Sequence, residues 1–243
     1  MEQRLPLVMD QINRAADKTG KRMIYLCSIT DAPHKMLDKA RRAIDLGANG
    51  LLVTYSAGLA AFRELTSHPD INVPVMMHGS HMIAMMKQIS WPVLGKLSRL
   101  CGADLMLTPT MWSSIPMVSM EEGLRTSFMK LAPWHHIKRT FPMPCAGVYP
   151  GLAEVIIGEY GPDIVIPAGG GMLGHPDGYT AGAQAWQQAI AAVMEGASLP
   201  EAARRPENKP LRRALEKWGY MRRPETPWLR LAPEFQPKPM KFD

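Results

Sequence analysis

Short apolar runs alternate with longer segments of helical spacing along residues 1–199, and this alternation constrains the fold more than any other feature. Each run is a few residues long, apolar at successive positions and bounded by Gly, Pro or Asp. Continuous apolar runs of that length are typical of strands buried on both faces, as in a parallel sheet. The six runs are residues 22–28, 50–56, 73–78, 104–109, 144–149 and 163–168.

Helices are predicted between these runs, where apolar residues recur every three or four positions and Gly or Asp stands at the segment ends. The helical segments are residues 31–46, 58–65, 94–101, 152–160 and 181–195. A strand–helix unit that occurs about six times predicts an α/β protein, either a doubly wound sheet or a barrel.

Polar and glycine residues gather at the carboxyl end of nearly every run. A (β/α)₈ barrel builds its site at that face from several strands, whereas an open sheet uses one switch point. The even spread favours the barrel, and six units instead of eight predict an incomplete one. These positions are Ser28, Thr30, Thr54, Ser56, His78, Ser80, Thr108, Thr110, Cys145, Tyr149 and Gly169–Gly171.

The composition, 46% hydrophobic and 21% charged, excludes a disordered or collagen-like chain. No apolar run reaches the roughly 18 residues of a membrane-spanning helix, and the amino terminus lacks the apolar segment of a signal peptide, so we expect a cytoplasmic protein. Three widely spaced cysteines without a CxxC pair argue against a disulfide framework or a zinc ribbon.

The charge is unevenly distributed. Residues 200–243 carry a net +5 and 8 of the 22 prolines, whereas residues 1–199 carry +1. We therefore expect a domain over residues 1–199 and a basic, proline-rich extension over residues 200–243, lying on a neighbouring subunit or in solvent. No RNP-like motif, zinc finger or recognition helix accompanies the extension, so nucleic-acid binding is not expected.

Two motifs could carry chemistry. The glycine-rich segment 168–178 follows the last run, and its backbone amides could bind an anion such as phosphate; the alternative is a tight turn that binds nothing. His78 could position or protonate a carbonyl substrate, and the alternative is a core histidine bonded to backbone. The Asp and Glu residues fall mostly on the predicted helices and at the beginnings of the strands, so we expect no metal site formed by this chain alone.

The segment Gly169–Gly178 resembles the GGGxxGHPxG segment of strand eight in the RuBisCO large-subunit catalytic barrel. Further stretches resemble the RuBisCO-like, non-carboxylating branch, which includes the 2,3-diketo-5-methylthiopentyl-1-phosphate enolase of methionine salvage. They are residues 48–53, 69–75, 94–97, 102–104 and 140–151. The resemblance covers about residues 5–200, so the six units would be strands three to eight of that barrel.

The resemblance implies a homodimer or larger oligomer with a phosphorylated small-molecule substrate. Backbone amides of Gly147, Gly169 and Gly170 would hold the phosphate, and His78, at the end of strand five, would be the catalytic histidine. Thr108 and Cys145 would contact the substrate. Cys145 stands where carboxylases have a serine, which leaves only a weak donor.

Departures from the family pattern limit the predicted activity. His78 is followed by Gly79 instead of a phosphate-binding arginine, and residues 108–116 hold no mobile-loop lysine, so we expect no CO₂ fixation. The family's Mg²⁺ is held by a carbamylated lysine, an Asp and a Glu from strands one and two, which the resemblance does not cover. A partner chain would have to supply them with the amino-terminal domain.

Three functions remain open. The chain could enolise a phosphorylated ketose or diketone once a partner completes the site. A sugar-phosphate isomerase or hydrolase on the same scaffold is not distinguished from it. The third is a non-catalytic or truncated barrel subunit, whose open strand edges would make it prone to associate.

Overall fold

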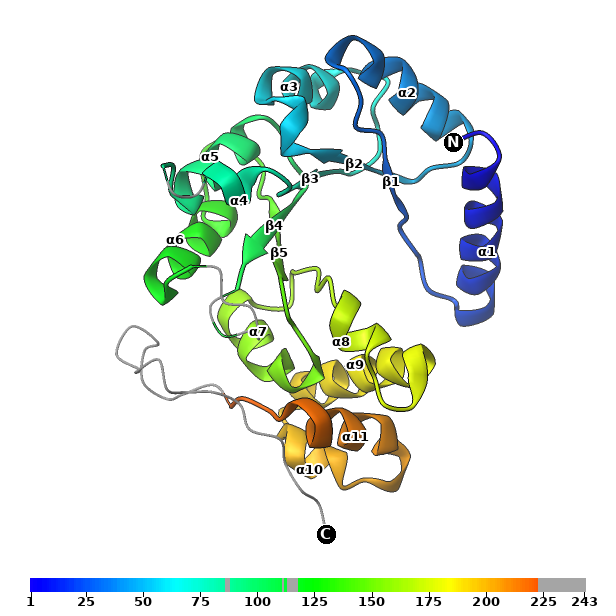
Figure 1. The fold of residues 1–243 in the computed structure, drawn as a ribbon, viewed down its shortest axis with the longest axis vertical. Coiled ribbons are helices and arrows are strands. Elements are labelled where there is room, and N and C mark those ends of the chain that lie inside the picture. Colours follow the sequence, from blue (N-terminus) through cyan, green and yellow to red (C-terminus); the bar gives the residue numbers. More distant parts are fainter. Residues whose placement is uncertain (86–87, 111, 113–117, 223–243) are drawn as a thin grey trace. The chain divides into compact units, whose positions relative to one another are not determined.

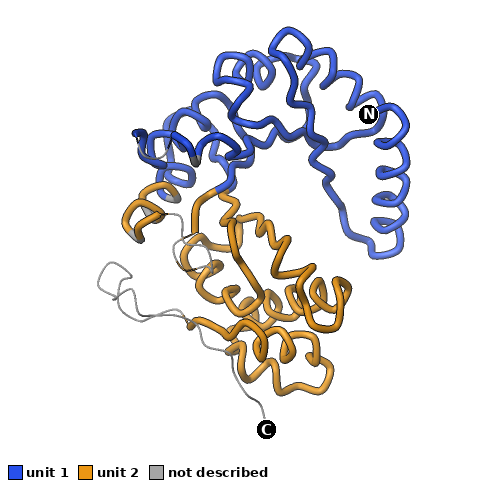
Figure 2. Tube along the Cα trace, in the orientation of Figure 1, with its two compact units in different colours: residues 1–107, 128–141 blue, residues 108–127, 142–243 orange. Residues whose placement is uncertain are grey.

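The computed structural model describes residues 1–85, 88–110, 112 and 118–222 (Figure 1). The chain divides into two compact units, each described here by itself. Unit 1 comprises residues 1–107 and 128–141, and unit 2 comprises residues 108–127 and 142–243 (Figure 2). The strands are β1 (Leu26–Ser28), β2 (Gly50–Thr54), β3 (Val75–His78), β4 (Leu105–Pro109) and β5 (Phe141–Cys145).

The five strands form one sheet in the order β1-β2-β3-β4-β5. Strands β1 to β4 pair in parallel, with Leu26 opposite Gly50, Leu51 opposite Val75, and Met76 opposite Leu105. This confirms the α/β class with parallel strands. Strands that are consecutive in the chain are also neighbours in the sheet, so the described strands show no switch point of the doubly wound kind.

Helices α2 and α3 of unit 1 lie together on one side of β1 and β2 (Figure 1). Helix α2 begins at a proline, which suits the first helical turn, and it buries one face through Met36, Ala40 and Ala43. Three helices predicted for this part of the chain are confirmed: α2, α3 and α5. The helices are α1 (Arg4–Thr19), α2 (Pro33–Asp45), α3 (Leu59–Ser67), α4 (Met82–Met85) and α5 (Trp91–Leu100), with the 3₁₀ turn η1 (Tyr55–Ala57).

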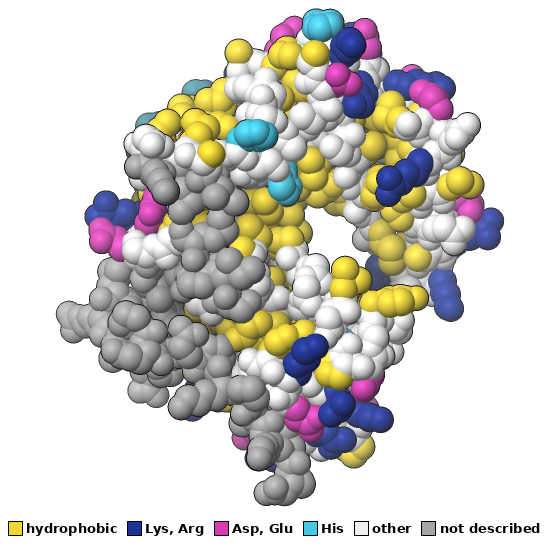
Figure 3. Space-filling view, viewed as in Figure 1, with side chains coloured by type: hydrophobic (Ala, Val, Ile, Leu, Met, Phe, Trp, Pro, Cys, Tyr) yellow, Lys and Arg dark blue, Asp and Glu magenta, His cyan; other side chains and the backbone are white. Residues whose placement is uncertain are grey.

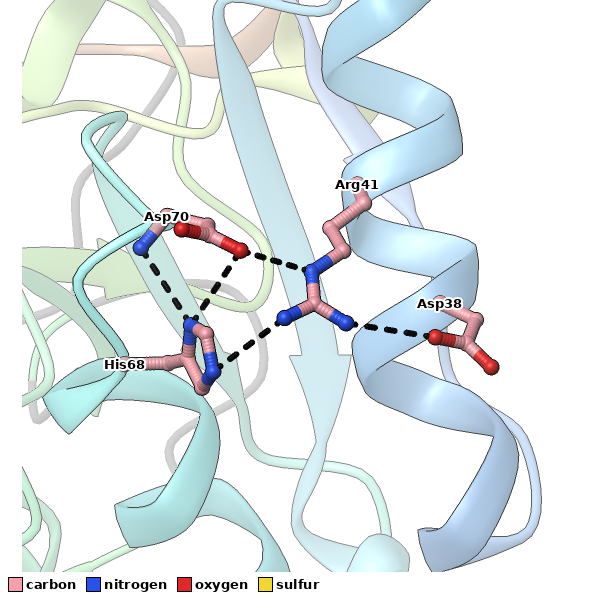
Figure 4. A network of polar contacts seen from close by, with 4 residues as sticks. All are labelled: Asp38, Arg41, His68 and Asp70. Atoms are coloured by element: carbon pink, nitrogen blue, oxygen red, sulfur yellow. Dashed lines mark hydrogen bonds and ion pairs between the residues drawn. The ribbon is translucent and has the colours of Figure 1, made fainter.

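A polar network fastens α2 to the segment after α3 (Figure 4). Arg41 Nε donates to Asp70 Oδ2 at 2.8 Å, and its guanidinium also reaches Asp38 and the ring of His68. These groups are partly exposed, so the pairs stabilise the unit only modestly.

Unit 2 is helical apart from its share of β4 and β5. Helix α9 is its centre and contacts α7, α8, α10 and α11. The predicted helices over residues 152–160 and 181–195 are confirmed. Helix α6 (Met120–Leu131) contains residues of both units. The remaining elements are α7 (Ala153–Tyr160), α8 (Gly169–Leu173), α9 (Gly178–Met194), α10 (Leu199–Ala203) and α11 (Lys209–Trp218), with the 3₁₀ turns η2 (Pro150–Leu152) and η3 (Pro206–Asn208).

The start of the expected basic extension is part of this unit. Helix α10 opens with a capping box formed by Ser198 and Glu201, and α11 buries Leu211, Ala214 and Leu215 completely. Helices α10 and α11 pack with α9 in unit 2, because α11 presents an amphipathic face to α9. The remainder of the extension, residues 223–243, lies outside the described residues.

Two strand predictions were wrong in position or kind. The fifth strand covers residues 141–145 instead of 144–149, because Phe141 N already donates to Asp104 O and because the positive φ angles of Ala146 and Gly147 end the strand. Residues 163–168 form no strand in the described structure. Pro162 and Pro167 have no N–H to donate, and Ile164 N bonds Pro162 O in a turn, which leaves Val165 N to Pro142 O as a single ladder-like bond.

Charged side chains of both signs are interspersed over α1–α3 on the face drawn in Figure 3. Ion pairs in this part of the chain include Arg42 with Glu2 and Lys39 with Asp31. Among the described helices, none is long and apolar enough to cross a membrane.

Candidate functional site

His78 is the last residue of β3, in register with Thr54 of β2. Its Nδ1 accepts the Ser80 amide N–H at 3.2 Å and lies 2.7 Å from Ser80 Oγ. Because Nδ1 accepts the amide N–H, the ring proton of the neutral imidazole is on Nε2. Desolvation of the half-buried ring lowers the pKa of His78 below its ordinary value of 6.5. The side chain is therefore a neutral donor at physiological pH.

Gly79 fits a packed environment within unit 1. A Cβ at this position would lie 3.5 Å from the ring of Trp91, 3.6 Å from Met82 Sδ and 3.7 Å from Leu107 Cβ. A long side chain in the orientation of the Cα–Cβ bond would have to displace these groups. The glycine at this position is thus accompanied by apolar packing that fills the nearby space.

The ends of β4 and β5 are joined by two threonines and a cysteine. Thr110 Oγ1 donates to Cys145 O at 2.6 Å and to Ala146 O at 3.2 Å, and Cys145 Sγ donates to Thr108 O at 3.5 Å. The predicted substrate contacts Thr108 and Cys145 therefore lie together. The side chain of Thr108 is buried, and the Cys145 thiol donates its hydrogen bond to a backbone carbonyl. Thr110 provides a link between the strand ends that sequence reasoning did not assign.

A left-handed turn follows β5. Ala146 and Gly147 have φ angles of 71° and 74°, a conformation that a non-glycine residue such as Ala146 adopts only when its surroundings impose it. The bifurcated bond from Thr110 to the carbonyls of Cys145 and Ala146 supplies that constraint. The turn redirects the chain from the strand into Val148 and Tyr149, which are buried in the core of unit 2.

The glycine triplet predicted to bind phosphate forms the first turn of α8. A Cβ on Gly169 or Gly170 would meet nothing within 4 Å, whereas a Cβ on Gly171 would lie 2.2 Å from Val148 O and 2.7 Å from Tyr149 Cα. The first amides of a helix have no partner within that helix. The structure therefore brings the 146–149 turn and α8 into backbone contact and leaves space beside Gly169 and Gly170.

A histidine that the sequence analysis did not assign organises the loop after α8. His175 is 4% exposed; its Nδ1 accepts the Asp177 amide at 3.0 Å, and its Nε2 donates to Pro210 O at 2.9 Å. The available signal was the spacing Gly-His-Pro-Asp-Gly, in which a histidine between turn residues can bond the amide two positions later.

Metal ligands are not grouped in the described part of the chain. There, no cluster of three or more His, Cys, Asp or Glu side chains could hold an ion. The described side chains therefore do not make up a Mg²⁺ site of the oxygen-rich kind.

Comparisons with known proteins agree on one family. The family model for the ribulose bisphosphate carboxylase large chain, catalytic domain, matches residues 1–218. A ribulose bisphosphate carboxylase-like protein of Archaeoglobus fulgidus is 39% identical over 202 residues, covering 81% of this chain and 46% of that protein. A 2,3-diketo-5-methylthiopentyl-1-phosphate enolase of Exiguobacterium sibiricum is 37% identical over 217 residues, covering 86% of this chain and 54% of that protein.

Solved structures give the same result. A rubisco-like protein from Alicyclobacillus acidocaldarius superposes with a TM-score of 0.82 at 36% identity, covering 90% of this chain and 56% of that one. The octameric Rubisco from Pyrococcus horikoshii superposes with a TM-score of 0.81 at 32% identity, covering 88% of this chain and 52% of that one.

The consecutive parallel strands and the glycine turns define an α/β protein of the TIM-barrel type found in these structures. The chain belongs to the family of the RuBisCO large-chain catalytic domain, and its relatives include RuBisCO-like proteins. It spans about half the length of the curated relatives it matches.

Proposed function

We propose that this chain contributes to an enolase-type, non-carboxylating RuBisCO-like site that acts on a phosphorylated diketone or ketose in the cytoplasm. The observation that carries the proposal is the pair of open glycines, Gly169 and Gly170, held against the 146–149 turn in a chain of this family. Relatives at 32–37% identity are named as 2,3-diketo-5-methylthiopentyl-1-phosphate enolases, which supports the diketone over other sugar phosphates.

In this proposal the phosphate is held by backbone amides of Gly147, Gly169 and Gly170. Backbone donors suit an anion because their positions are fixed before it binds and their dipoles favour negative charge. With no arginine at position 79, the interaction lacks a cationic partner and its affinity is expected to be weak. Thr108 and Cys145 would contact the substrate between the two turns and the strand ends.

His78 is proposed to act on the carbonyl. In enolisation a carbon–hydrogen bond beside the carbonyl breaks, its electron pair forms the carbon–carbon double bond, and negative charge develops on the carbonyl oxygen. The Nε2–H of neutral His78 would donate to that oxygen and stabilise the charge as it forms. The base that takes the carbon-bound proton and the ligands for Mg²⁺ are proposed to come from a partner polypeptide.

Assembly is part of the proposal. The Pyrococcus horikoshii Rubisco is described as octameric and the Hyperthermus butylicus one as dimeric. For this chain we propose either a homo-oligomer or a complex with a chain that supplies the other half of the family's length. Association would also cover the outer edge of β1, which has a described strand partner on one side only.

The test uses the protein isolated under native conditions through a carboxyl-terminal tag, so that any partner is retained. The diketone phosphate is incubated in D₂O with Mg²⁺, and loss of the proton signal beside the carbonyl is followed by NMR. We expect exchange in the native protein, a decrease of about 100-fold in His78→Asn, and no change in the control His34→Asn, whose histidine lies exposed on α2.

Other outcomes separate the alternatives. Binding of the substrate without proton exchange would contradict the enolase proposal and favour a non-catalytic subunit. Conversion of a sugar phosphate to its isomer or to free phosphate would favour the isomerase or hydrolase. Incorporation of labelled bicarbonate into ribulose bisphosphate would contradict the prediction that this chain fixes no CO₂.

A further inference from the structure

The segment from Lys209 to Met221 contacts the turn that follows β5. Trp218 stacks on Tyr149, with ring centroids 6.1 Å apart and planes inclined by 24°. Met221 N donates to Gly151 O at 2.9 Å. A Cβ on Gly151 would lie 2.0 Å from Gly219 O, so the two backbones touch there. The carboxyl end of α11 is thus held directly against the chain that leaves the 146–149 turn.

The same segment also contacts the carboxyl end of α8. His175 Nε2 donates to Pro210 O at 2.9 Å, and Lys217 Nζ donates to Gly174 O at 2.5 Å. A Cβ on Gly174 would lie 3.5 Å from the ring of Trp218. Helix α8 has only five residues, too few to be stable without tertiary contacts, so its position depends on these contacts together with its packing on α9, where Gly182 lies against Met172 O.

One side chain is common to both sets of contacts. The ring of Trp218 faces Tyr149 on one side and meets His175 edge-on at 6.3 Å, beside Gly174. Tyr149 and His175 are 5% and 4% exposed, and the partly buried Trp218 covers both rings. Burial raises the pKa of the Tyr149 phenol, and this ring therefore stays neutral.

We propose that Trp218 is a positioning residue that fixes α8 relative to the 146–149 turn, and that the segment 209–221 is a brace for the two glycine turns. The inference rests on the proposed function, in which these turns share one phosphate. Amides that converge on a phosphate lose affinity when one set moves by about 1 Å. The direct contact between the turns, Gly171 with Val148 O, sets how closely they approach, and the role proposed for the brace is to fix their orientation.

The experiment compares Trp218→Ala and Trp218→Phe in the full chain, with inorganic phosphate as the probe. Dissociation constants are measured by ³¹P NMR, and the amide signals of Gly169 and Gly170 are followed by ¹⁵N NMR. Trp218→Ala is expected to weaken phosphate binding about tenfold and to shift both amide signals. Trp218→Phe keeps a stacking ring and should remain within about threefold of the native protein.

A control separates positioning from general loss of stability. Phe62→Ala removes a completely buried ring from α3 of unit 1 and should lower the melting temperature while leaving phosphate binding unchanged. If Trp218→Ala does not fold, Lys217→Met replaces it, since this change removes the bond to Gly174 O and the cation–π contact with the Trp218 ring and is expected to weaken binding about threefold.

The outcomes distinguish the inference from the proposed function. A folded Trp218→Ala protein with native phosphate affinity would overturn the brace and leave the phosphate site standing. If the native protein binds no phosphate, the proposed function fails, and hydrogen exchange then tests the brace alone. Faster exchange at residues 169–174 in Trp218→Ala, but not in Phe62→Ala, would support it; equal rates in the native and Trp218→Ala proteins would overturn it.

Discussion

Both units use side-chain bonds to the backbone, but among the described residues only unit 2 also has backbones in direct contact at glycines. In unit 1, side chains donate to or accept from the backbone at a distance: Asn49 bonds the chain before β1, and Asp104 Oδ2 accepts Val75 N. In unit 2, the backbones themselves touch at glycines, with Gly171 against Val148 O and Gly182 against Met172 O. Polar side-chain links tolerate small adjustments, whereas a glycine contact has no room for even one methyl group.

This difference predicts where each unit is vulnerable. Parallel strands with outer helices leave gaps that polar side chains such as Arg99 bridge. Helix α8 of unit 2 has only five residues, and it reaches its position because glycines allow close approach. Unit 2, which carries the predicted phosphate turns, should therefore lose more stability on substitution of a packed residue than unit 1 does. Four measurements test this expectation.

The largest effect is expected for Gly171→Ala. Its methyl group would lie 2.2 Å from Val148 O, and separating the two backbones should cost about 3 kcal/mol of unfolding free energy. Gly170→Ala, one residue earlier, meets nothing within 4 Å and should be neutral or stabilise the protein by up to about 1 kcal/mol. Urea denaturation measures the unfolding free energy of both variants. An equal decrease in the two would contradict the difference between a packed and an open glycine.

Arg99→Met is expected to cost about 2 to 3 kcal/mol in unit 1. The buried guanidinium donates to the carbonyls of Lys138, Met129, Ala132 and Ile137, and methionine would leave these acceptors without their charged donor. Lys96→Met, on the exposed side of the same helix, is the matched control and should change stability by less than about 0.5 kcal/mol. A loss in Arg99→Met no greater than in this control would show that the bonds to Arg99 are dispensable.

Asn49→Ala should have a smaller effect, about 1 to 2 kcal/mol. Asn49 Oδ1 accepts Tyr25 N at 2.8 Å, and its Nδ2 donates to Met23 O at 2.8 Å, so the change removes both links to the segment before β1. Hydrogen exchange at Tyr25 should accelerate, while exchange in β3 stays slow. Uniform acceleration across unit 1 would instead indicate global unfolding.

The smallest effect is the pH dependence contributed by His78. Desolvation lowers its folded-state pKa below 6.5, so the unfolded chain takes up the proton first as the pH falls. Stability from this group is present above pH 6.5 and is lost as the pH falls through the folded-state pKa. Thermal denaturation between pH 5 and 8 should therefore show a shallower decline in His78→Asn; an unchanged slope would contradict the desolvated environment.

Local sequence patterns predicted much of this protein. Continuous apolar runs identified β1–β4, and helical spacing identified α2, α3, α5, α7 and α9, because both signals depend on which side of an element meets the core. The same pattern failed for residues 163–168, where prolines at 162 and 167 remove donors that a run of Ile and Val does not reveal. It also misplaced β5, whose end is set by the left-handed turn at Ala146.

The sequence by itself determined the parallel α/β class, the family and the glycine triplet, since these depend on residue types in a fixed order. Tertiary structure alone decided which glycine is packed and which is open. Gly169 and Gly171 are the same residue type in one triplet, but only Gly171 lies against another backbone. It likewise turned the start of a basic, proline-rich segment into α11, because burial of Leu211, Leu215 and Trp218 depends on partners far away in the chain.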